Sequence, residues 1–203
     1  MAKLTALSAE KKGWSESYGE LELNQVAFPF TGRIEAQMPL AENFIGEVGM
    51  ILVVDKWDDK AVRAFDEDKD DEYSLFALNY STETVYDERK GALHYFHQVR
   101  GTGSYDWLGI GDQNDIYPRL GYLSVGDRFT TSAITVDETT AAAFEANIAN
   151  YNGNMFKAGT DGYWVAYDED EGATNVGPII KVIDAKLGMP DGSYGFKVEV
   201  VKA

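Results

Sequence analysis

Two acidic stretches contain the residues whose spacing could bind a cation. Asp66–Asp70 has an aspartate at every second position, as the start of a calcium-binding loop does, and Asp168–Gly172 repeats part of the pattern. An EF-hand loop also needs glycine at its sixth position and glutamate at its twelfth. Here these positions hold Asp71 and Ala77. We therefore expect solvated acidic loops and no metal site, with weak calcium binding as the alternative.

The chain has two histidines, His94 and His97. Residues three apart share one face of a helix, and this spacing is compatible with metal binding. Nothing else in the sequence around them completes a ligand set, so we expect ordinary polar residues. The sequence predicts no cofactor.

The usual signatures of nucleophilic and nucleotide-dependent catalysis are missing from the sequence. There is no G-x-S-x-G elbow and no phosphate-binding G-x-x-x-x-G-K motif. Ser104 and Ser193 follow glycine in turn-like segments, and Gly109-x-Gly111 lacks the third glycine of a dinucleotide loop. We predict no catalytic residues and no enzyme activity. A hydrolase that uses two of the 34 acidic residues stays open as an alternative.

Aromatic residues are abundant, with 12 Tyr, 10 Phe and four Trp. Those in or beside glycine-rich loops could stack on sugar rings or fill a protein interface if they are exposed. The alternative is that they belong to the core. The candidate interface residues are Leu4, Trp14, Tyr18, Trp107, Tyr163 and Trp164.

The net charge of −16 is concentrated in two segments. Asp55–Glu72 contains nine acidic and four basic residues, and Asp161–Glu171 contains five acidic residues and no basic one, so each carries −5. Such a field repels phosphate backbones, which argues against a nucleic-acid partner and favours a basic one. The absence of cysteine fits folding in a reducing cytosol. Met50–Val54 is the longest apolar run, so we expect neither a leader nor a membrane anchor.

The elements that must position these residues are mostly strands. Period-2 alternation predicts strands in segments 20–30, 31–39 and 194–201, and a continuous apolar run predicts a buried strand in 46–57. Segment 176–187, which is rich in Ile and Val, is expected to be a further strand. Further apolar segments lie at 73–79 and 163–167, and a weak helix signal begins at Ser81. We predict an extended arm over residues 1–19 and a single β-rich domain over 20–203. The fold class is mainly β with one or two helices, either a β-sandwich or a barrel-like domain.

The stretch Arg119–Asp137 is central to this prediction. It is expected to form a hairpin of two strands around a Val125-Gly126-Asp127 turn. A helix is predicted next, capped by Asp137, running to Tyr151, with Phe144 and Ile148 on its buried face. Asn152–Asn154 is expected to end the helix, which would pack on a sheet.

Three blocks resemble the head decoration, or cement, proteins of tailed bacteriophages. They are Phe76–Val99, Tyr122–Asp137 with its G-D-x-F-T-T-x-A motif, and the late strand Tyr194–Lys202. Together they cover about a quarter of the chain, and none is a catalytic motif.

The resemblance implies a non-enzymatic virion protein that binds the outer capsid surface and stabilises it. Its partner would be the major capsid protein. It would be made in the cytoplasm of the host bacterium and act as a homo-oligomer on the virion. The arm, with the loops around Trp107 and Trp164, would supply the contact area. The alternative is a phage adhesin or carbohydrate-binding module that uses exposed aromatic residues.

Overall fold

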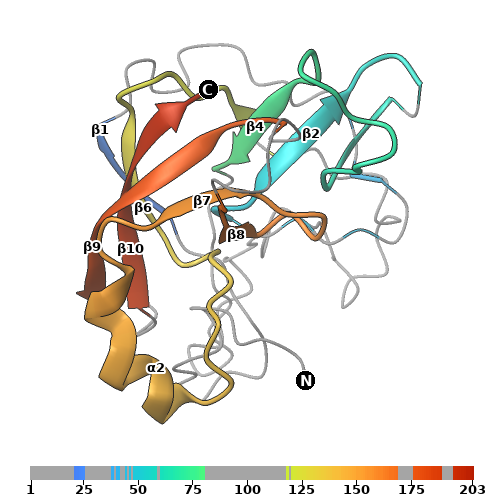
Figure 1. Ribbon diagram of the computed structural model, residues 1–203. Helices are drawn as coiled ribbons and strands as arrows, with labels where there is room; N and C mark the ends of the chain where they lie inside the picture. Colours follow the sequence, from blue (N-terminus) through green and yellow to red (C-terminus); the bar gives the residue numbers. More distant parts are fainter. Residues whose placement is uncertain are drawn as a thin grey trace, which may run out of the picture.

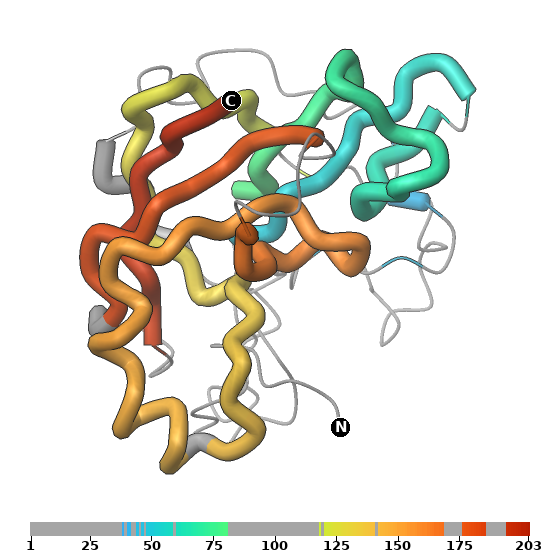
Figure 2. The backbone as a smooth tube through the Cα atoms, in the orientation of Figure 1, coloured from blue at the N-terminus to red at the C-terminus, as the bar shows by residue number. Residues whose placement is uncertain are grey.

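The computed structural model describes residues 21–25, 38, 40–41, 44, 46, 48–58, 60–80, 118, 120–168, 176–188 and 194–203. This part of the chain is mainly β, as predicted (Figures 1 and 2). Its strands are β1 (Leu21–Gln25), β2 (Ile51–Asp55), β3 (Ala61–Arg63), β4 (Phe76–Asn79), β5 (Leu120–Gly121), β6 (Arg128–Thr131), β7 (Met155–Ala158), β8 (Trp164–Ala166), β9 (Ile179–Gly188) and β10 (Tyr194–Lys202).

The strands form two antiparallel sheets. The larger has the order β1-β6-β10-β9-β7-β8, and the smaller has the order β3-β2-β4-β5. Strands β9 and β10 form a long hairpin near the centre of the larger sheet, and β2 and β4 form the centre of the smaller one (Figure 1). The described strands therefore form two separate sheets, as in the sandwich alternative.

Strand β2 is buried on both faces, as its continuous apolar run predicted. Ile51 and Val53 belong to the large core, which also contains side chains of the six-stranded sheet such as Phe129 and Val198. Leu52 and Val54, on the opposite face of the strand, belong to a second, smaller core. Burial of a large aliphatic side chain contributes about 1.5–3 kcal/mol. The large core therefore holds the two sheets together.

The predicted hairpin in Arg119–Asp137 is wrong in its pairing, although the strand-turn-strand order is right. Strand β5 pairs with β4 of the smaller sheet, whereas β6 lies between β1 and β10 of the larger one. The turn is built as expected: the Ser124 amide donates to Asp127 Oδ2 (2.8 Å), and Gly126 has a φ of +92°. The Gly126 amide also donates to the Val200 carbonyl (2.8 Å). The turn is thus attached to β10, and the chain crosses there between the sheets.

The predicted helix is present but begins later than expected. α2 spans Ala141–Asn147 and continues as a 3₁₀ helix over Ile148–Tyr151. Its N-cap is Thr140, whose Oγ1 accepts from the Ala143 amide (3.3 Å), and not Asp137. The Asp137 amide instead donates to the Tyr151 hydroxyl (3.1 Å), so this aspartate lies in the connection before the helix.

The packing of this helix follows the prediction. Phe144 and Ile148 are buried in the large core, and the Phe144 ring lies 6.1 Å from that of Phe196 on β10. The helical segment ends at Tyr151 with Asn152 as its C-cap, and Gly153 then takes a φ of +87°. The helix therefore covers part of the larger sheet (Figure 1).

Several predictions fall outside the described residues. They are the arm (1–19), most of the strand at 31–39, the helix from Ser81, the loop at 101–117, and His94, His97, Ser104 and Ser193.

Candidate functional site

Of the six aromatic and apolar residues predicted to form an interface, the structure places only two. Trp164 is fully buried, and its indole Nε1 donates to the Gly49 carbonyl at 3.1 Å. Its prediction as a surface contact is wrong, because β8 turns the indole into the large core beside Phe129. Tyr163 is half-buried and packs against the smaller core, so an interface role for it stays a prediction. Leu4, Trp14, Tyr18 and Trp107 lie outside the described residues.

Another set of large side chains is exposed on the smaller sheet. Trp57 is 83% exposed, Tyr73 79%, Leu75 39% and Tyr122 37%. We call these three aromatic residues, together with Leu75, the aromatic strip. Trp57 follows β2, Tyr73 and Leu75 precede β4, and Tyr122 follows β5, so all four lie on loops of one sheet. The residues at 57, 73 and 75 line one hollow of about 240 Å³, and those at 75 and 122 line the next.

Sequence reasoning missed the strip, although a local signal for part of it existed. Trp57 is followed by Asp58 and Asp59, and Tyr73 follows Asp71 and Glu72. A large aromatic side chain inside an acidic, solvated segment has little apolar surface nearby in sequence to cover it. That contrast was a better guide to exposure than proximity to glycine.

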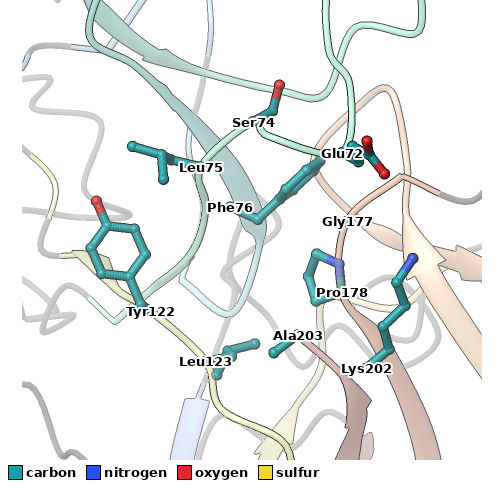
Figure 3. Close-up of a pocket in the computed structure, with 10 residues that line it drawn as sticks. All are labelled: Glu72, Ser74, Leu75, Phe76, Tyr122, Leu123, Gly177, Pro178, Lys202 and Ala203. Carbon is teal, nitrogen blue, oxygen red and sulfur yellow. The ribbon is translucent and has the colours of Figure 1, made fainter.

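The second hollow is a pocket between the two sheets, with a volume of about 420 Å³ (Figure 3). Figure 3 shows Leu75, Phe76, Tyr122 and Leu123 along one side and Pro178, Lys202 and Ala203 along the other. Glu72 and Ser74 stand at one end. The volume is in the lower part of the range of about 300–1,000 Å³ typical of ligand pockets. We call it the inter-sheet pocket.

A close backbone approach shapes this pocket. Gly177 has a φ of +88°, and a Cβ placed there would lie 2.7 Å from Cζ of Phe76. Only glycine allows both the backbone conformation and the contact with the ring. Gly177 thereby brings the segment before β9 against β4.

A third hollow of about 840 Å³ lies beside the loop that carries Tyr73. Its acidic lining residues are Glu67, Asp68, Asp70, Asp71 and Glu72, and Lys157 is its basic residue. We call it the acidic hollow. Glu72 lines both this hollow and the inter-sheet pocket. Glu72 therefore borders both a depression lined mainly by apolar residues and an acidic one.

An internal ion pair fixes this loop. Both terminal nitrogens of Arg63, at the end of β3, donate to the Asp70 carboxylate, at 2.7 and 2.9 Å. The Asp66 amide (2.8 Å) and the Ser74 hydroxyl (3.2 Å) also donate to Asp70, and Arg63 reaches Asp55 at 3.3 Å. Forked guanidinium–carboxylate pairs are strong and directional. The pair therefore holds the base of the loop rigidly beside β3.

The pair also determines the protonation of its carboxyl groups. Burial of Asp70 disfavours its ionised form, but the hydrogen bonds from Arg63, the Asp66 amide and Ser74 outweigh burial and lower its pKa. For Asp55, burial is likewise outweighed by the amides of Asp58 and Trp57 and by Arg63, so its pKa is lowered too. Both carboxylates remain charged at neutral pH.

The aspartates of the calcium-like pattern take part in these turns. Asp70 accepts from Arg63, and Asp66 Oδ1 accepts from the Asp68 amide at 3.1 Å. A cation at Asp70 would have to displace the guanidinium. Among the described residues, no group of three or more potential metal ligands comes together. Of the second pattern, Asp168–Gly172, only Asp168 lies among them.

The arrangement is suited to binding: exposed aromatic rings, an apolar pocket and a row of carboxylates on one rigid loop. Fold and site together define a mainly β, two-sheet domain with a candidate interaction surface on its smaller sheet. Comparisons with protein-family models, curated proteins and solved structures found no match. Within the described residues, no helix is both long and apolar enough to cross a membrane.

Proposed function

We propose that this chain is a non-enzymatic structural protein of a bacteriophage particle, which binds the outer surface of the capsid and stabilises it. The observation that carries the proposal is the aromatic strip, with Trp57 and Tyr73 about four-fifths exposed on loops of a rigid sheet. The resemblance of three blocks to phage decoration proteins supplies the kind of partner.

Exposed aromatic side chains suit such an attachment. Trp and Tyr each bury about 150–250 Å² in a contact and are enriched among the residues that dominate binding energy. The Arg63–Asp70 pair fixes the loop that carries Tyr73, so less conformational entropy is lost on binding. The partner is the major capsid protein, and the strip covers the junction between neighbouring subunits.

Repeated weak contacts would be sufficient for stable attachment. A homo-oligomer that presents several strips binds a repeating surface with an avidity far above that of a single strip. The protein would be made in the host bacterium and remain on the outside of the virion.

The experiment is co-sedimentation with undecorated capsids assembled from the major capsid protein of the same virus. The double variant Trp57→Ala/Tyr73→Ala is expected to bind at least about tenfold more weakly, a loss of about 1.4 kcal/mol or more. The matched control is Val125→Ala/Ile183→Ala, which removes two exposed apolar side chains that are not part of the strip. Equal sedimentation of both variants would reject the strip as the attachment surface. Deletion of residues 1–19 tests the arm separately and is also expected to abolish attachment.

The exposed rings of Trp57 and Tyr73 also favour a second candidate, a carbohydrate-binding module or adhesin. Flat aromatic faces stack on sugar rings. A glycan array separates the two: saturable binding of a defined sugar by the isolated protein, lost in the same double variant, would support the module.

A further inference from the structure

Two depressions of different chemistry meet at Glu72. The inter-sheet pocket offers the apolar side chains of Phe76 on β4, Leu123 after β5 and Pro178 before β9, with Ser74 and Lys202 as further lining residues. The acidic hollow is lined by five carboxylates and Lys157. Because Glu72 borders both, a single short segment of a partner could reach into the two at once.

The charges of the acidic hollow are not equally available to a partner. The Asp70 carboxylate is already neutralised by Arg63 and has only 3% of its side chain exposed. The remaining four acidic residues, Glu67, Asp68, Asp71 and Glu72, are all exposed. Four exposed carboxylates around one hollow, against one lysine, attract a cationic group of a partner.

The exposed Tyr73 ring lines this same hollow. A guanidinium pairs with a carboxylate through two charge-assisted hydrogen bonds and is also attracted to an aromatic face as a cation. The acidic hollow is therefore complementary to a basic side chain, and the inter-sheet pocket to an apolar one.

We propose that the inter-sheet pocket and the acidic hollow together recognise a partner segment in which an apolar side chain stands next to an arginine or lysine. The apolar side chain enters the inter-sheet pocket between Phe76 and Pro178. The basic side chain crosses Glu72 into the acidic hollow and lies against Tyr73. The source of the segment, a capsid subunit, rests on the proposed function, whereas its chemistry rests on the two depressions alone.

The test is an NMR titration of the full chain with short blocked peptides. The probe is acetyl-Gly-Arg-Leu-Gly-amide, and its controls replace Arg by Glu or Leu by Ser. We expect saturable shifts of amides in segments 65–76 and 122–123, with binding at least about tenfold weaker for either control peptide. Equal binding of the Glu peptide, shifts centred elsewhere or no saturable shift would each overturn the proposal.

Two charge-reversal variants sharpen the result. Glu72→Lys is expected to weaken the Arg–Leu peptide at least about tenfold. Glu145→Lys makes the same charge change on α2, at the far end of the molecule in Figure 1, and is expected to leave binding unchanged. Glu72 is exposed, so the fold should persist, and Glu72→Gln repeats the test without a reversed charge. Equal losses in the 72 and 145 variants would mean that net charge alone is sensed.

Failure of this proposal and failure of the proposed function give different results. Peptide binding without any capsid sedimentation would remove the capsid as partner and leave the recognised chemistry intact. Capsid sedimentation that survives Glu72→Lys and shows no dependence on salt would keep the capsid as partner and reject the recognised chemistry.

Discussion

At the scale of residues, the central interaction is the ion pair between Arg63 and Asp70. Its carboxylate has 3% of its surface exposed and the guanidinium side chain 12%, so water replaces neither partner easily. Removing one partner of such a pair leaves the other buried and uncompensated, which is far more costly than losing a surface pair. The pair determines where the exposed ring of Tyr73 is held.

We expect Asp70→Asn to lower the free energy of unfolding by about 2 kcal/mol or more, because Arg63 loses its charged acceptor. For a chain of this size, that corresponds to a fall in Tm of about 4–8 °C. Thermal unfolding followed by circular dichroism measures it. The control Asp68→Asn changes an exposed aspartate of the same loop and should shift Tm by no more than about 1 °C.

The same variant gives a pH signature. Because the folded-state pKa of Asp70 is lowered from its usual 3.8, its stabilising effect is present above that value. It is lost as the pH falls through the lower folded-state pKa. The stability difference between the native protein and Asp70→Asn should therefore be largest at neutral pH and shrink below about pH 4. A difference that is constant with pH would show that the carboxylate charge is not what stabilises the loop.

At the scale of elements, the approach of the segment before β9 to β4 depends on Gly177. We expect Gly177→Ala to be clearly more destabilising than Gly153→Ala, as measured by chemical denaturation. Both glycines have a φ near +87°, so both changes carry a backbone cost of about 1–2 kcal/mol. At Gly153 nothing lies within 4 Å of the new Cβ, whereas at Gly177 it lies 2.7 Å from the Phe76 ring. Overpacking adds about 1–3 kcal/mol. Equal effects would show that the Phe76 ring on β4 moves away from the new Cβ at little cost in free energy.

The elements also show what local sequence patterns can predict. The apolar run of β2 and the alternation of β10 each contain enough signal to place a strand and its buried side chains. The pairing of β5 and β6 could not be found in this way, because their partners β4 and β10 lie about 40 and 70 residues away in sequence. Local chemistry likewise placed the turn at Gly126 correctly.

The site was harder to predict than the fold. Trp164 stands beside glycine-rich sequence, but strand alternation turns it inward, and its indole nitrogen finds a partner in the Gly49 carbonyl. Conversely, Tyr73 is exposed, as the acidic residues that precede it indicated, and the Arg63–Asp70 pair ties the base of its loop over a distance of seven residues. The burial of Trp164 and this ion pair do not follow from the residues adjacent in sequence.

At the scale of the whole molecule, one core joins the two sheets. It contains Ile51 and Val53 of the smaller sheet together with Phe196, Val198 and Val200 of the larger one. Neither sheet can separate without exposing the apolar face of the other. We therefore expect the described part of the chain to unfold in a single cooperative transition.

Native-state hydrogen exchange tests this expectation. The amides of β2 and those of β10 should open with the same free energy and the same dependence on denaturant. The control is the exposed first turn of α2 near Ala142, where fraying should be independent of denaturant. Exchange of β2 well before β10 would mean that the smaller sheet unfolds on its own.

Strand β10 lies between β6 and β9 in the interior of the larger sheet, and it is antiparallel to both. The hydrogen bonds of antiparallel ladders run perpendicular to the strands. A mechanical pull along the strand from its Lys202 end therefore shears both ladders at once and cannot open them one rung at a time. The attachment of Val200 to the turn at Gly126 adds a further anchor at that end. A force applied at that end therefore has to break the hydrogen bonds of both ladders together.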